Sequence, residues 1–552
     1  MKVLVFFSRL VILLALCMPA QQVWATVNDT GWEYIEPGID YREYTVAGPN
    51  RVFVARMDRS AQDVILDTSI AQGRLIYGGE KVSDMARRYD DALNFAENPS
   101  GTVFGYRNQV VVAINGGFVV PGTTIPYGGV IQSGWYAKRY EPASGAAFGW
   151  KYDVDDVSKR QVFIGDCVYH NLTKQYVRNI STNEKILINA VNTSRPSNSM
   201  VLYTPQYNTN TLTSSDGVEM LVEMRRASLI LSEPWGAKGI VKQVRIGAGS
   251  TMIPFDHIVL SAHGTAATIL RNMVVEGDEI EVDQEIINCT VPSTEPNWVK
   301  TYAGLTGDHT FLKAGVIIPH PNPDKNTDVH PRTAVAFNDQ YIYFVVVDGR
   351  QPGVSVGMTY VQLAAFSKDF LGASWGMALD GGGSSTMVIN GMVMNIPSDS
   401  CTWKVFLPYV RSNQQASTEA ADASHLMDTD VDVSALPSMV CERLVGSGLM
   451  MIVLQDPQIS NIFTPGDRVL VQVDAQVRLG PGTNYALLGS VPAGTQGTVL
   501  HQISDLDGIY AKGQYWWKVS FGNLVGWVSQ NNLVWTSGYY PLQLEREIPA
   551  TN

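Results

Sequence analysis

The chain has 552 residues, of which 45% are hydrophobic and 17% are charged, and its formal net charge is −12. This length is too great for one compact core and predicts two or three domains, and the composition excludes a largely disordered protein. The acidic balance argues against general binding to nucleic acids or to anionic membrane surfaces.

The first 25 residues predict a secretory signal peptide. Lys2 and Arg9 are followed by an apolar stretch and then by Val23-Trp24-Ala25, so we expect cleavage after Ala25. An uncleaved membrane anchor is the alternative. No later stretch approaches the roughly 20 apolar residues of a spanning helix, so no transmembrane segment is expected after cleavage. The mature chain would carry 38 basic and 52 acidic residues, a net charge of −14.

Four cysteines remain after signal cleavage: Cys167, Cys289, Cys401 and Cys441. An even number in an exported protein favours disulfides. Cys401 with Cys441 would close a local insertion, which leaves Cys167 with Cys289, and four buried free thiols are the alternative. No Cys-x-x-Cys or His-x-x-x-His spacing indicates a zinc site, and we expect no metal and no cofactor.

Residues 26–455 predict one large, strand-rich domain with few helices. One helix is expected near 83–95, where Ser83 would cap its start. A second is expected over 359–371, where Thr-Tyr-Val-Gln has the capping-box pattern. Residues 398–440 are polar and lack strand periodicity, so they predict a long surface insertion.

The composition changes from about residue 463, where five or six short strands alternate with Gly and Pro turns. Roughly 70 residues of this kind form a small closed β-barrel, which we place at 463–537 before a tail at 538–552. The expected fold class is therefore α+β, with a large strand-rich mixed domain followed by a small all-β barrel.

Three apolar strands end in a polar residue followed by glycine, at Asn115, Asp348 and Asp380. The expected helix at 359–371 lies between the last two of these strands. Strand, helix and strand form a βαβ unit, so these strands would be parallel and neighbouring. Both aspartates would then emerge at one edge of the sheet, where open α/β sheets bind their ligands. A single Asp-Gly of this kind is often only a turn.

The stretch LDGGGSSTMVING, residues 379–391, follows the last of these strands. A P-loop would require a lysine and a following helix, and a nucleophile elbow would require Gly-x-Ser-x-Gly, so neither pattern fits. Asn390-Gly391 instead predicts a two-residue hairpin. The glycine N–H groups and the hydroxyls of Ser384 and Ser385 are candidate donors to a ligand.

His330, Arg332 and Thr333 stand directly before another strand. Guanidinium groups bind phosphate and carboxylate in a bidentate way, so Arg332 and Arg350 are the expected cations of an anion site. For His330, a structural role is the alternative to a role in this site. Two carboxylates with arginines predict an exported enzyme for an anionic, polar substrate, and residue types alone leave glycosyl and phosphoester chemistry both open.

At these residues the chain resembles the phosphodiester glycosidases, the family of the N-acetylglucosamine-1-phosphodiester α-N-acetylglucosaminidases. The motifs that carry the resemblance are INGGF, HPRTAVAF, VVVDGRQPGVSVGMTYVQLAAF, LGASWGMALDGGGSSTMVINGMVMNIPSD and ERLVGSG. They span roughly 28–455, interrupted by the insertion at 398–440. The resemblance implies hydrolysis of a sugar-1-phosphodiester to free sugar and a phosphomonoester.

The resemblance, together with the residue pattern, implies two sets of site residues. The catalytic set is Asp348, Asp380, Arg332 and Arg350. The substrate-binding set is Asn115, Gly116, Gly117, His330, Thr333, Gly381, Gly382, Gly383, Ser384, Ser385, Glu442 and Arg443. The chain departs from the family pattern at Val119, after Arg443, and in YAGLTGDHTFL, where the family has a glycine-rich stretch.

The C-terminal barrel resembles bacterial Src-homology-3-like domains through VRLGPGTNYALLGSVPAGTQGTVL and WWKVSFGNLVGWV. This resemblance implies a bacterial source, a secreted or cell-envelope location, and peptidoglycan or another wall glycan as a partner. A non-catalytic glycan-binding protein is therefore an alternative to the glycosidase, and a metal-dependent phosphodiesterase is another.

A mechanism follows as a hypothesis from the two sets. Arg332 and Arg350 would hold the phosphate, and either Asp348 or Asp380 would activate water or stabilise the sugar cation. The sequence does not assign the two aspartates to separate roles.

Overall fold

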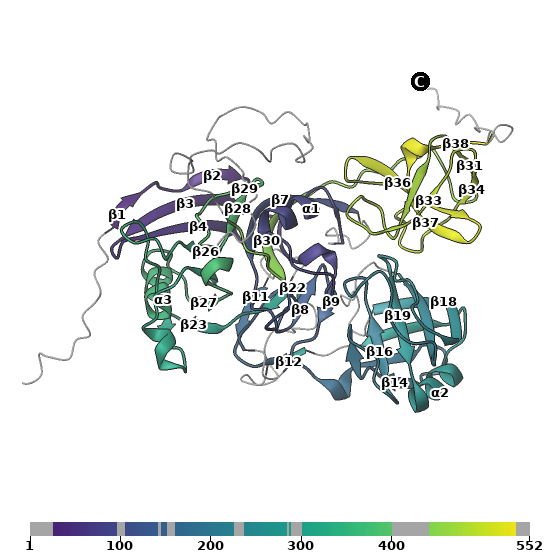
Figure 1. Cartoon of the computed structure of the whole chain (residues 1–552), viewed down its shortest axis with the longest axis horizontal. Helices are drawn as coiled ribbons and strands as arrows, with labels where there is room; N and C mark the ends of the chain where they lie inside the picture. Colours follow the sequence, from purple (N-terminus) through teal and green to yellow (C-terminus); the bar gives the residue numbers. More distant parts are fainter. Residues whose placement is uncertain are drawn as a thin grey trace, which may run out of the picture.

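The computed structural model describes residues 26–95, 105–141, 145–151, 161–225, 237–283, 286–288, 301–399 and 441–536. The expected signal peptide, nearly all of the expected insertion at 398–440 and the tail therefore lie outside the described residues. In the part of the chain that is described, no helix is long and apolar enough to cross a membrane. This part is rich in strands and has few helices (Figure 1), in agreement with a strand-rich α+β fold.

A nine-stranded sheet carries most of the candidate site residues. Its order is β1–β3–β4–β26–β25–β27–β23–β24, with β2 paired to β3. The strands are β1 (Thr26–Asp29), β2 (Glu33–Glu36), β3 (Ile39–Val46), β4 (Asn50–Asp58), β23 (His309–Lys313), β24 (Val316–Ile317), β25 (Arg332–Phe337), β26 (Tyr341–Val347) and β27 (Trp375–Ala378). Every residue of β25 is buried, as expected for a central strand covered on both faces.

The expected βαβ unit is only partly correct. Strands β26 and β27 run in the same direction, but they are not neighbours, because β25 lies between them and pairs antiparallel with both. The helix between them, α3 (Tyr360–Asp369), begins with the expected capping box of Thr359 and Gln362. The connection from β26 through α3 to β27 is long enough to pass over one strand. The apolar strand β25 therefore lies between β26 and β27 in the sheet. Asp348 and Asp380 still follow the same ends of their strands.

Two further sheets share a core with the first. The six-stranded sheet has the order β29–β28–β7–β30–β5 with β6 on β7, and the five-stranded sheet has the order β11–β10–β22–β8–β9. Their strands are β5 (Val64–Ile70), β6 (Leu93–Asn94), β7 (Tyr106–Asn115), β28 (Met387–Ile389), β29 (Met392–Val393), β30 (Ser447–Gln455), β8 (Val130–Gln132), β9 (Trp135–Lys138), β10 (Ala147–Lys151), β11 (Gln161–Gly165) and β22 (Thr301–Thr306). Phe344, Leu66 and Phe148, one from each sheet, belong to one buried cluster.

The expected hairpin at Asn390-Gly391 is confirmed. It joins β28 to β29, and both of its residues have positive φ, 47° and 77°. Two positive φ values match the twist of a tight hairpin, which is why Asn-Gly is favoured there.

The first helix differs from the expectation at both ends. Helix α1 (Val82–Tyr89) is preceded by Lys81, which makes no side-chain cap, and Ser83 instead donates its backbone N–H to Glu442. The helix ends early because Asp90 is already extended, with a ψ of 140°, and Asp91 has a φ of 51° before the chain enters β6. Apolar residues at the end of the expected helix thus belong to a strand.

An eight-stranded sheet within residues 176–283, here called the insert sheet, has its own core. Its order is β14–β13–β20–β18–β17–β19–β16–β15. The strands are β13 (Tyr176–Asn179), β14 (Lys185–Leu187), β15 (Ala190–Val191), β16 (Met200–Tyr203), β17 (Gly217–Met224), β18 (Ala237–Ala248), β19 (His257–Ala262) and β20 (Glu279–Asp283), and α2 (Gly264–Met273) lies beside them. A two-stranded ribbon of β12 (Val168–His170) and β21 (Ile286–Asn288) adjoins it in the chain.

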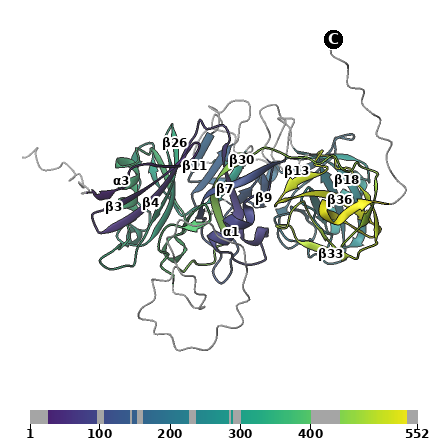
Figure 2. The same cartoon turned by 90° about the horizontal axis from the view of Figure 1, so that it is seen from above.

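The barrel is a sheet of eight strands in the order β33–β32–β37–β36–β34–β31–β38, with β35 on β36. They are β31 (Arg468–Val471), β32 (Ala475–Arg478), β33 (Leu487–Val491), β34 (Gln496–Val499), β35 (Ile509–Ala511), β36 (Gln514–Phe521), β37 (Leu524–Ser529) and β38 (Leu533–Trp535). In Figures 1 and 2 the barrel lies directly against the insert sheet. Ile509 and Trp516 of the barrel belong to the same buried cluster as Val222 of that sheet.

Cys167 and Cys441 are each disulfide-bonded. Because Cys289 and Cys401 lie outside the described residues, the expected pairing of the four cysteines stays a prediction.

Candidate active site

The turn after β27 is held from beneath by Asn115 at the end of β7. The Asn115 amide donates to the carbonyl of Asp380 at 2.7 Å, and its side-chain oxygen accepts from the Thr333 hydroxyl at 2.7 Å and from the N–H of Thr386 at 3.2 Å. Asn115 and Thr333 are both fully buried. These two predicted substrate-binding residues therefore hold the turn in place, and neither faces solvent.

The glycines of this turn allow arginine head groups to lie directly against the backbone. A Cβ atom on Gly382, where φ is +65°, would lie 3.0 Å from Nη2 of Arg350, and one on Gly383 would lie 2.6 Å from Nη2 of Arg443. A Cβ on Gly381 would lie 2.7 Å from the carbonyl oxygen of Pro331. Because glycine has no side chain, the guanidinium groups of Arg350 and Arg443 can lie directly against the backbone of this turn.

Gly116 and Gly117 are required for a different close contact. A Cβ on Gly116 would lie 2.3 Å from the hydroxyl of Ser447, and one on Gly117 would lie 2.0 Å from the carbonyl oxygen of Thr306. The carbonyl of Gly116 also accepts from the N–H of Asp380 at 3.1 Å. The two glycines therefore bring three strand ends together at the site.

Asp380 presents a largely buried carboxyl at this turn. Its Oδ2 accepts from the Ser384 hydroxyl at 2.7 Å. Burial raises the pKa of Asp380 to about 6, against the opposing effects of the Ser384 hydrogen bond and the Arg443 charge. A carboxyl with such a pKa changes its protonation state close to neutral pH, which suits acid and base catalysis.

Arg332 is buried, with 6% of its surface exposed. Its Nε donates to the carbonyl of Met358 at 2.7 Å, and its Nη2 donates to the carbonyl of Asp328 at 2.9 Å. The guanidinium lies 4.0 Å from the centre of the Tyr360 ring. This arginine is therefore fixed by neutral partners and keeps its full positive charge for other groups nearby.

Arg350 is exposed and adopts a left-handed backbone with a φ of 59°. Within the described residues its side chain makes no hydrogen bond or ion pair, and its guanidinium lies against Gly382 of the glycine turn. Arg443 differs, because it forms a bidentate pair with Asp399 at 2.8 and 3.1 Å. Burial, and after it the charges of Arg332 and Arg350, lowers the pKa of His330.

Four residues that the sequence analysis missed complete the cation-rich surroundings. Asp308 accepts from Lys325 at 2.9 and 3.1 Å and from the Tyr360 hydroxyl, and His320 lies 3.8 Å away. The N–H of Asp308 donates to the carbonyl of Ala378, which places it at the same sheet edge as Asp380. The signal in the sequence was weaker here, since Gly307-Asp308 also follows a buried strand but has the glycine before the polar residue.

Asp348 lies in different surroundings from Asp380. Its buried carboxyl accepts from the Asn395 amide at 3.0 Å and from the N–H of Ile396 at 3.1 Å, and Arg51 lies 3.8 Å away. Burial raises the pKa of Asp348 to about 6 as well. The charges that act on it come from Arg51 and Glu43, so the structure does not present it as the second member of a carboxylate pair with Asp380.

Glu442 is occupied by another contact, and Ser385 is buried. Glu442 accepts from the backbone N–H and the hydroxyl of Ser83, at the first turn of α1. The Ser385 hydroxyl is buried and has no hydrogen-bond partner among the described residues. In the same part of the chain, no three His, Cys, Asp or Glu side chains are arranged to hold a metal ion.

Comparison with family models identifies two parts of the chain. Residues 243–406 match phosphodiester glycosidase, and residues 473–534 match the bacterial SH3 domain. Arg332, Arg350 and Asp380 lie within the first match, whereas Asn115 and Arg443 lie outside it. The comparison with curated proteins gave no match.

Three solved structures are similar to the chain at low identity. A hypothetical protein from Synechocystis shares 15% identity with a TM-score of 0.45, covering 75% of this chain and 62% of its own. A putative exported protein from Burkholderia pseudomallei shares 19% with a TM-score of 0.43, covering 73% and 74%. The zebrafish N-acetylglucosamine-1-phosphodiester alpha-N-acetylglucosaminidase catalytic domain, auto-inhibited by its pro-peptide, shares 13% with a TM-score of 0.33, covering 78% and 87%. The chain thus spans less than two thirds of the Synechocystis protein.

Proposed function

We propose, from the phosphodiester glycosidase domain that residues 243–406 carry, that this protein hydrolyses a sugar-1-phosphodiester to free sugar and a phosphomonoester. The observation that supports the proposal most directly is the position of Asp380. Its carboxyl has a pKa raised to about 6, and it lies on a glycine turn against which Arg350 and Arg443 pack. A substrate phosphate would meet the arginines while the sugar meets the carboxyl.

In this proposal Asp380 acts as the base. It takes a proton from a water molecule whose oxygen bonds to the anomeric carbon, while the bond from that carbon to the phosphate oxygen breaks and its electron pair leaves with the phosphate. A phosphate monoester is a weak base, so its departure needs charge stabilisation more than protonation. Arg350 supplies exposed donors for that charge, and the buried Arg332 adds a fixed positive field.

Asp348 has a positioning role in the proposal. Its carboxyl binds the side chain of Asn395 and the backbone of Ile396, and Asn395 donates to the carbonyl of Ser385 at 2.9 Å. This chain of contacts connects β26 to the end of the glycine–serine turn. Asp348 therefore acts on the site through the shape of the turn.

The test uses the purified full chain with an α-N-acetylglucosamine-1-phosphomethyl substrate, and compares wild type with Asp380→Asn and Asp339→Asn. Asp339 is an exposed aspartate at the other end of β25, so its substitution controls for loss of charge alone. Release of sugar by wild type and Asp339→Asn, but not by Asp380→Asn, supports the proposal. Equal release by all three proteins contradicts the role of Asp380.

Hydrolysis in water labelled with heavy oxygen separates this reaction from cleavage by a phosphodiesterase. The label enters the sugar if the carbon–oxygen bond breaks and enters the phosphate if the phosphorus–oxygen bond breaks. If the label enters the phosphate and a chelator abolishes activity, the protein is a metal-dependent phosphodiesterase and the glycosidase proposal is wrong. If no sugar-phosphate substrate is hydrolysed, the alternative of a non-catalytic binding protein replaces the glycosidase proposal.

Export and a cell-envelope substrate belong to the same proposal. They are supported by the apolar N-terminal segment with its Ala25 site and by the bacterial SH3 match at 473–534. N-terminal sequencing of the secreted protein would give Thr26 as the first residue if cleavage occurs as proposed. A protein that retains its first residues and stays with membranes would favour the uncleaved anchor.

A further inference from the structure

A cavity of about 780 Å³ lies between the insert sheet and the barrel, away from the candidate active site. One wall is formed by β17, β18 and the segment that follows β18, including Glu223, Lys242 and Met252. The other wall is formed by barrel residues, including Arg478, Lys518 and Trp527. Its volume lies within the range of about 300 to 1,000 Å³ that is typical of small-molecule sites.

The two walls are held together by direct contacts. Phe255, which follows the segment on the insert side, packs edge-to-face on Trp527 with 5.5 Å between ring centres and lies 5.6 Å from Tyr485. Its N–H donates to the carbonyl of Leu479 at 3.2 Å, and Gln502 donates to Asp256 at 2.5 Å. The cavity is therefore a feature of the docked pair of modules, which neither sheet forms alone.

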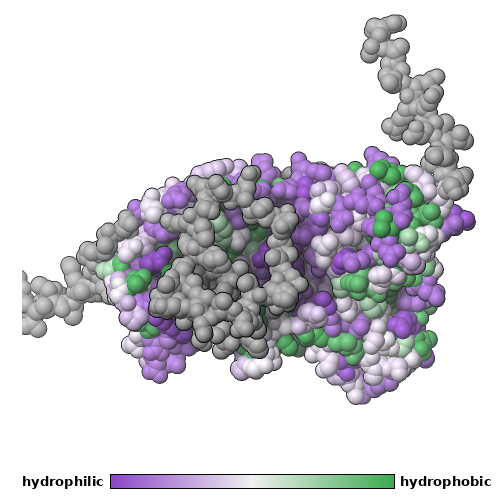
Figure 3. Space-filling view, turned by 45° about the horizontal axis from the view of Figure 1, so that its top comes forward, coloured by the Kyte–Doolittle hydropathy of each residue, from purple (hydrophilic) through white to green (hydrophobic). Residues whose placement is uncertain are grey.

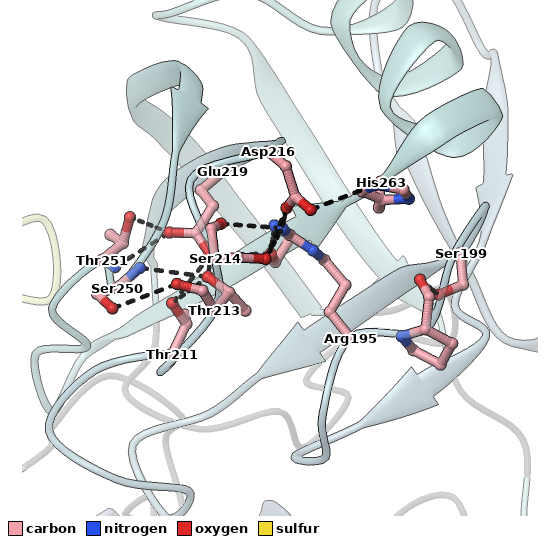
Figure 4. A network of polar contacts seen from close by, with 12 residues as sticks. Arg195, Ser199, Thr211, Thr213, Ser214, Asp216, Glu219, Ser250, Thr251 and His263 are labelled. Carbon is pink, nitrogen blue, oxygen red and sulfur yellow. Dashed lines mark hydrogen bonds and ion pairs between the residues drawn. The ribbon is translucent and has the colours of Figure 1, made fainter.

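The insert wall is supported by a buried carboxylate. Figure 4 shows Glu219 surrounded by hydroxyl groups, and it accepts from the Thr251 N–H at 3.0 Å, from Thr213 at 2.6 Å and from Ser261 at 2.8 Å. These hydrogen bonds outweigh burial and lower the pKa of Glu219. The Thr251 hydroxyl also donates to Glu219, and it accepts from Arg245 at 2.5 Å. Glu219 thus keeps the cavity-lining segment at Ser250 and Thr251 in one conformation.

The lining carries an excess of positive charge in an acidic protein. Four cations line the cavity, Lys242, Arg245, Arg478 and Lys518, against a single carboxylate, Glu223. Glu223 is 2% exposed and is shared by Lys242 at 3.0 Å and Lys518 at 3.3 Å. The carboxylates of Glu219 and Asp256 lie buried behind the lining, and the charge of Asp256 acts on Lys518, so the four cations exceed the three carboxylates by one charge, which attracts a further anion. The chain as a whole has a net charge of −12, so this excess is local.

The lining also offers apolar surface and one unpaired donor. Met252 and Val525 are 39% and 41% exposed although both are hydrophobic. Trp527 lines the cavity and is 1% exposed, and its indole N–H has no hydrogen-bond partner among the described residues. A buried N–H without a partner is costly and points to a missing acceptor. In Figure 3 hydrophobic residues lie among hydrophilic ones on the side of the molecule that holds these two modules.

We propose that this cavity binds a short segment of an anionic glycan. Its phosphate or carboxylate groups would pair with Lys242 and Lys518, and its sugar rings would cover the apolar surface at Met252 and Val525. The site is separate from the turn at Asp380. Binding there would hold a polymer on the protein whether or not the proposed hydrolysis occurs, so the two proposals can fail independently.

Calorimetric titration of the full chain tests the proposal with three probes of similar length. They are a phosphodiester-linked oligosaccharide, an oligogalacturonate and a neutral chitin oligosaccharide. The Asp380→Asn protein is used so that no probe is consumed. At least one anionic oligomer should bind, with an affinity that falls as salt is raised, and the neutral one should bind at least about tenfold more weakly. Preference for phosphate or for carboxylate then identifies the source of the anion.

Three variants in this background assign the binding to the cavity. Lys242→Gln combined with Lys518→Gln should weaken anion binding about tenfold. Glu223→Gln should strengthen it severalfold, because it frees both lysines. Lys238→Gln, on the same strand but outside the lining, should leave it unchanged. A structural role for these residues would not produce opposite changes for the lysines and for Glu223.

The proposal is overturned if none of the oligomers binds, or if the neutral and anionic oligomers bind equally. It is also overturned if the lysine variants bind as tightly as the parent while Arg350→Gln abolishes binding, since the glycan would then occupy the candidate active site. Circular dichroism spectra that match the parent protein establish that each variant is folded.

Discussion

Asp348 and Asp380 follow two strands of one sheet, each is followed by glycine, and burial raises the pKa of both to about 6. Their surroundings nevertheless differ. The carboxyl of Asp348 is occupied by the Asn395 amide and the Ile396 N–H, whereas that of Asp380 accepts one hydroxyl and lies among arginines. A raised pKa alone therefore does not identify a catalytic carboxyl, and we base the proposed role of Asp380 on its partners.

The largest effect is expected from Asp380→Asn, which should lower kcat for the sugar-1-phosphodiester by about 10³-fold. An amide cannot take the proton of the attacking water, and a positioned base contributes about 10²- to 10⁴-fold. Steady-state kinetics of sugar release measure the loss. Asp348→Asn should lose much less, because an amide oxygen still accepts the two N–H groups. Equal losses for the two variants would remove the distinction between them.

Asp348→Ala should lower the free energy of unfolding by about 3 kcal/mol, since it leaves two buried N–H donors without an acceptor. Denaturant unfolding measures this value. Asp348→Asn should cost much less, because its amide oxygen still accepts both N–H groups and no buried charge is left. A loss below 1 kcal/mol for the alanine variant would show that these donors find other partners.

Asp380→Asn should stabilise the protein at pH 8 by about 2 kcal/mol relative to wild type, from a pKa difference of roughly two units. A raised carboxyl pKa means that the folded state holds the proton more tightly. Its stabilising contribution is therefore complete below the unfolded pKa near 4 and is lost as the pH rises through about 6. The difference in unfolding free energy between the two proteins should disappear at pH 4, and a constant difference would contradict this.

The smallest effect is expected from Glu442→Gln, which should lower stability by about 1 kcal/mol. Its carboxylate accepts from the N–H and the hydroxyl of Ser83 at the start of α1. KM for the substrate should stay unchanged, and thermal unfolding together with kinetics would show both results. A rise in KM without loss of stability would restore Glu442 to the substrate-binding set.

The sequence by itself determined the features that depend on neighbouring residues. The capping box of α3, the Asn390-Gly391 hairpin, the strands that end at Asn115, Asp348 and Asp380, and the closely spaced strands of the barrel all follow from local periodicity and turn chemistry. The same motifs also identified the domain that the family comparison matches at 243–406.

Only the tertiary structure decided which of these features meet. It placed β25 between β26 and β27, assigned Ser83 to Glu442, gave Asp348 amide and backbone partners, and brought Asp308 and Lys325 to the edge where Asp380 lies. It also joined the insert sheet and the barrel around a basic cavity. The physical reason is that strand order, burial and charge pairing are set by residues far apart in the chain, which local patterns do not encode.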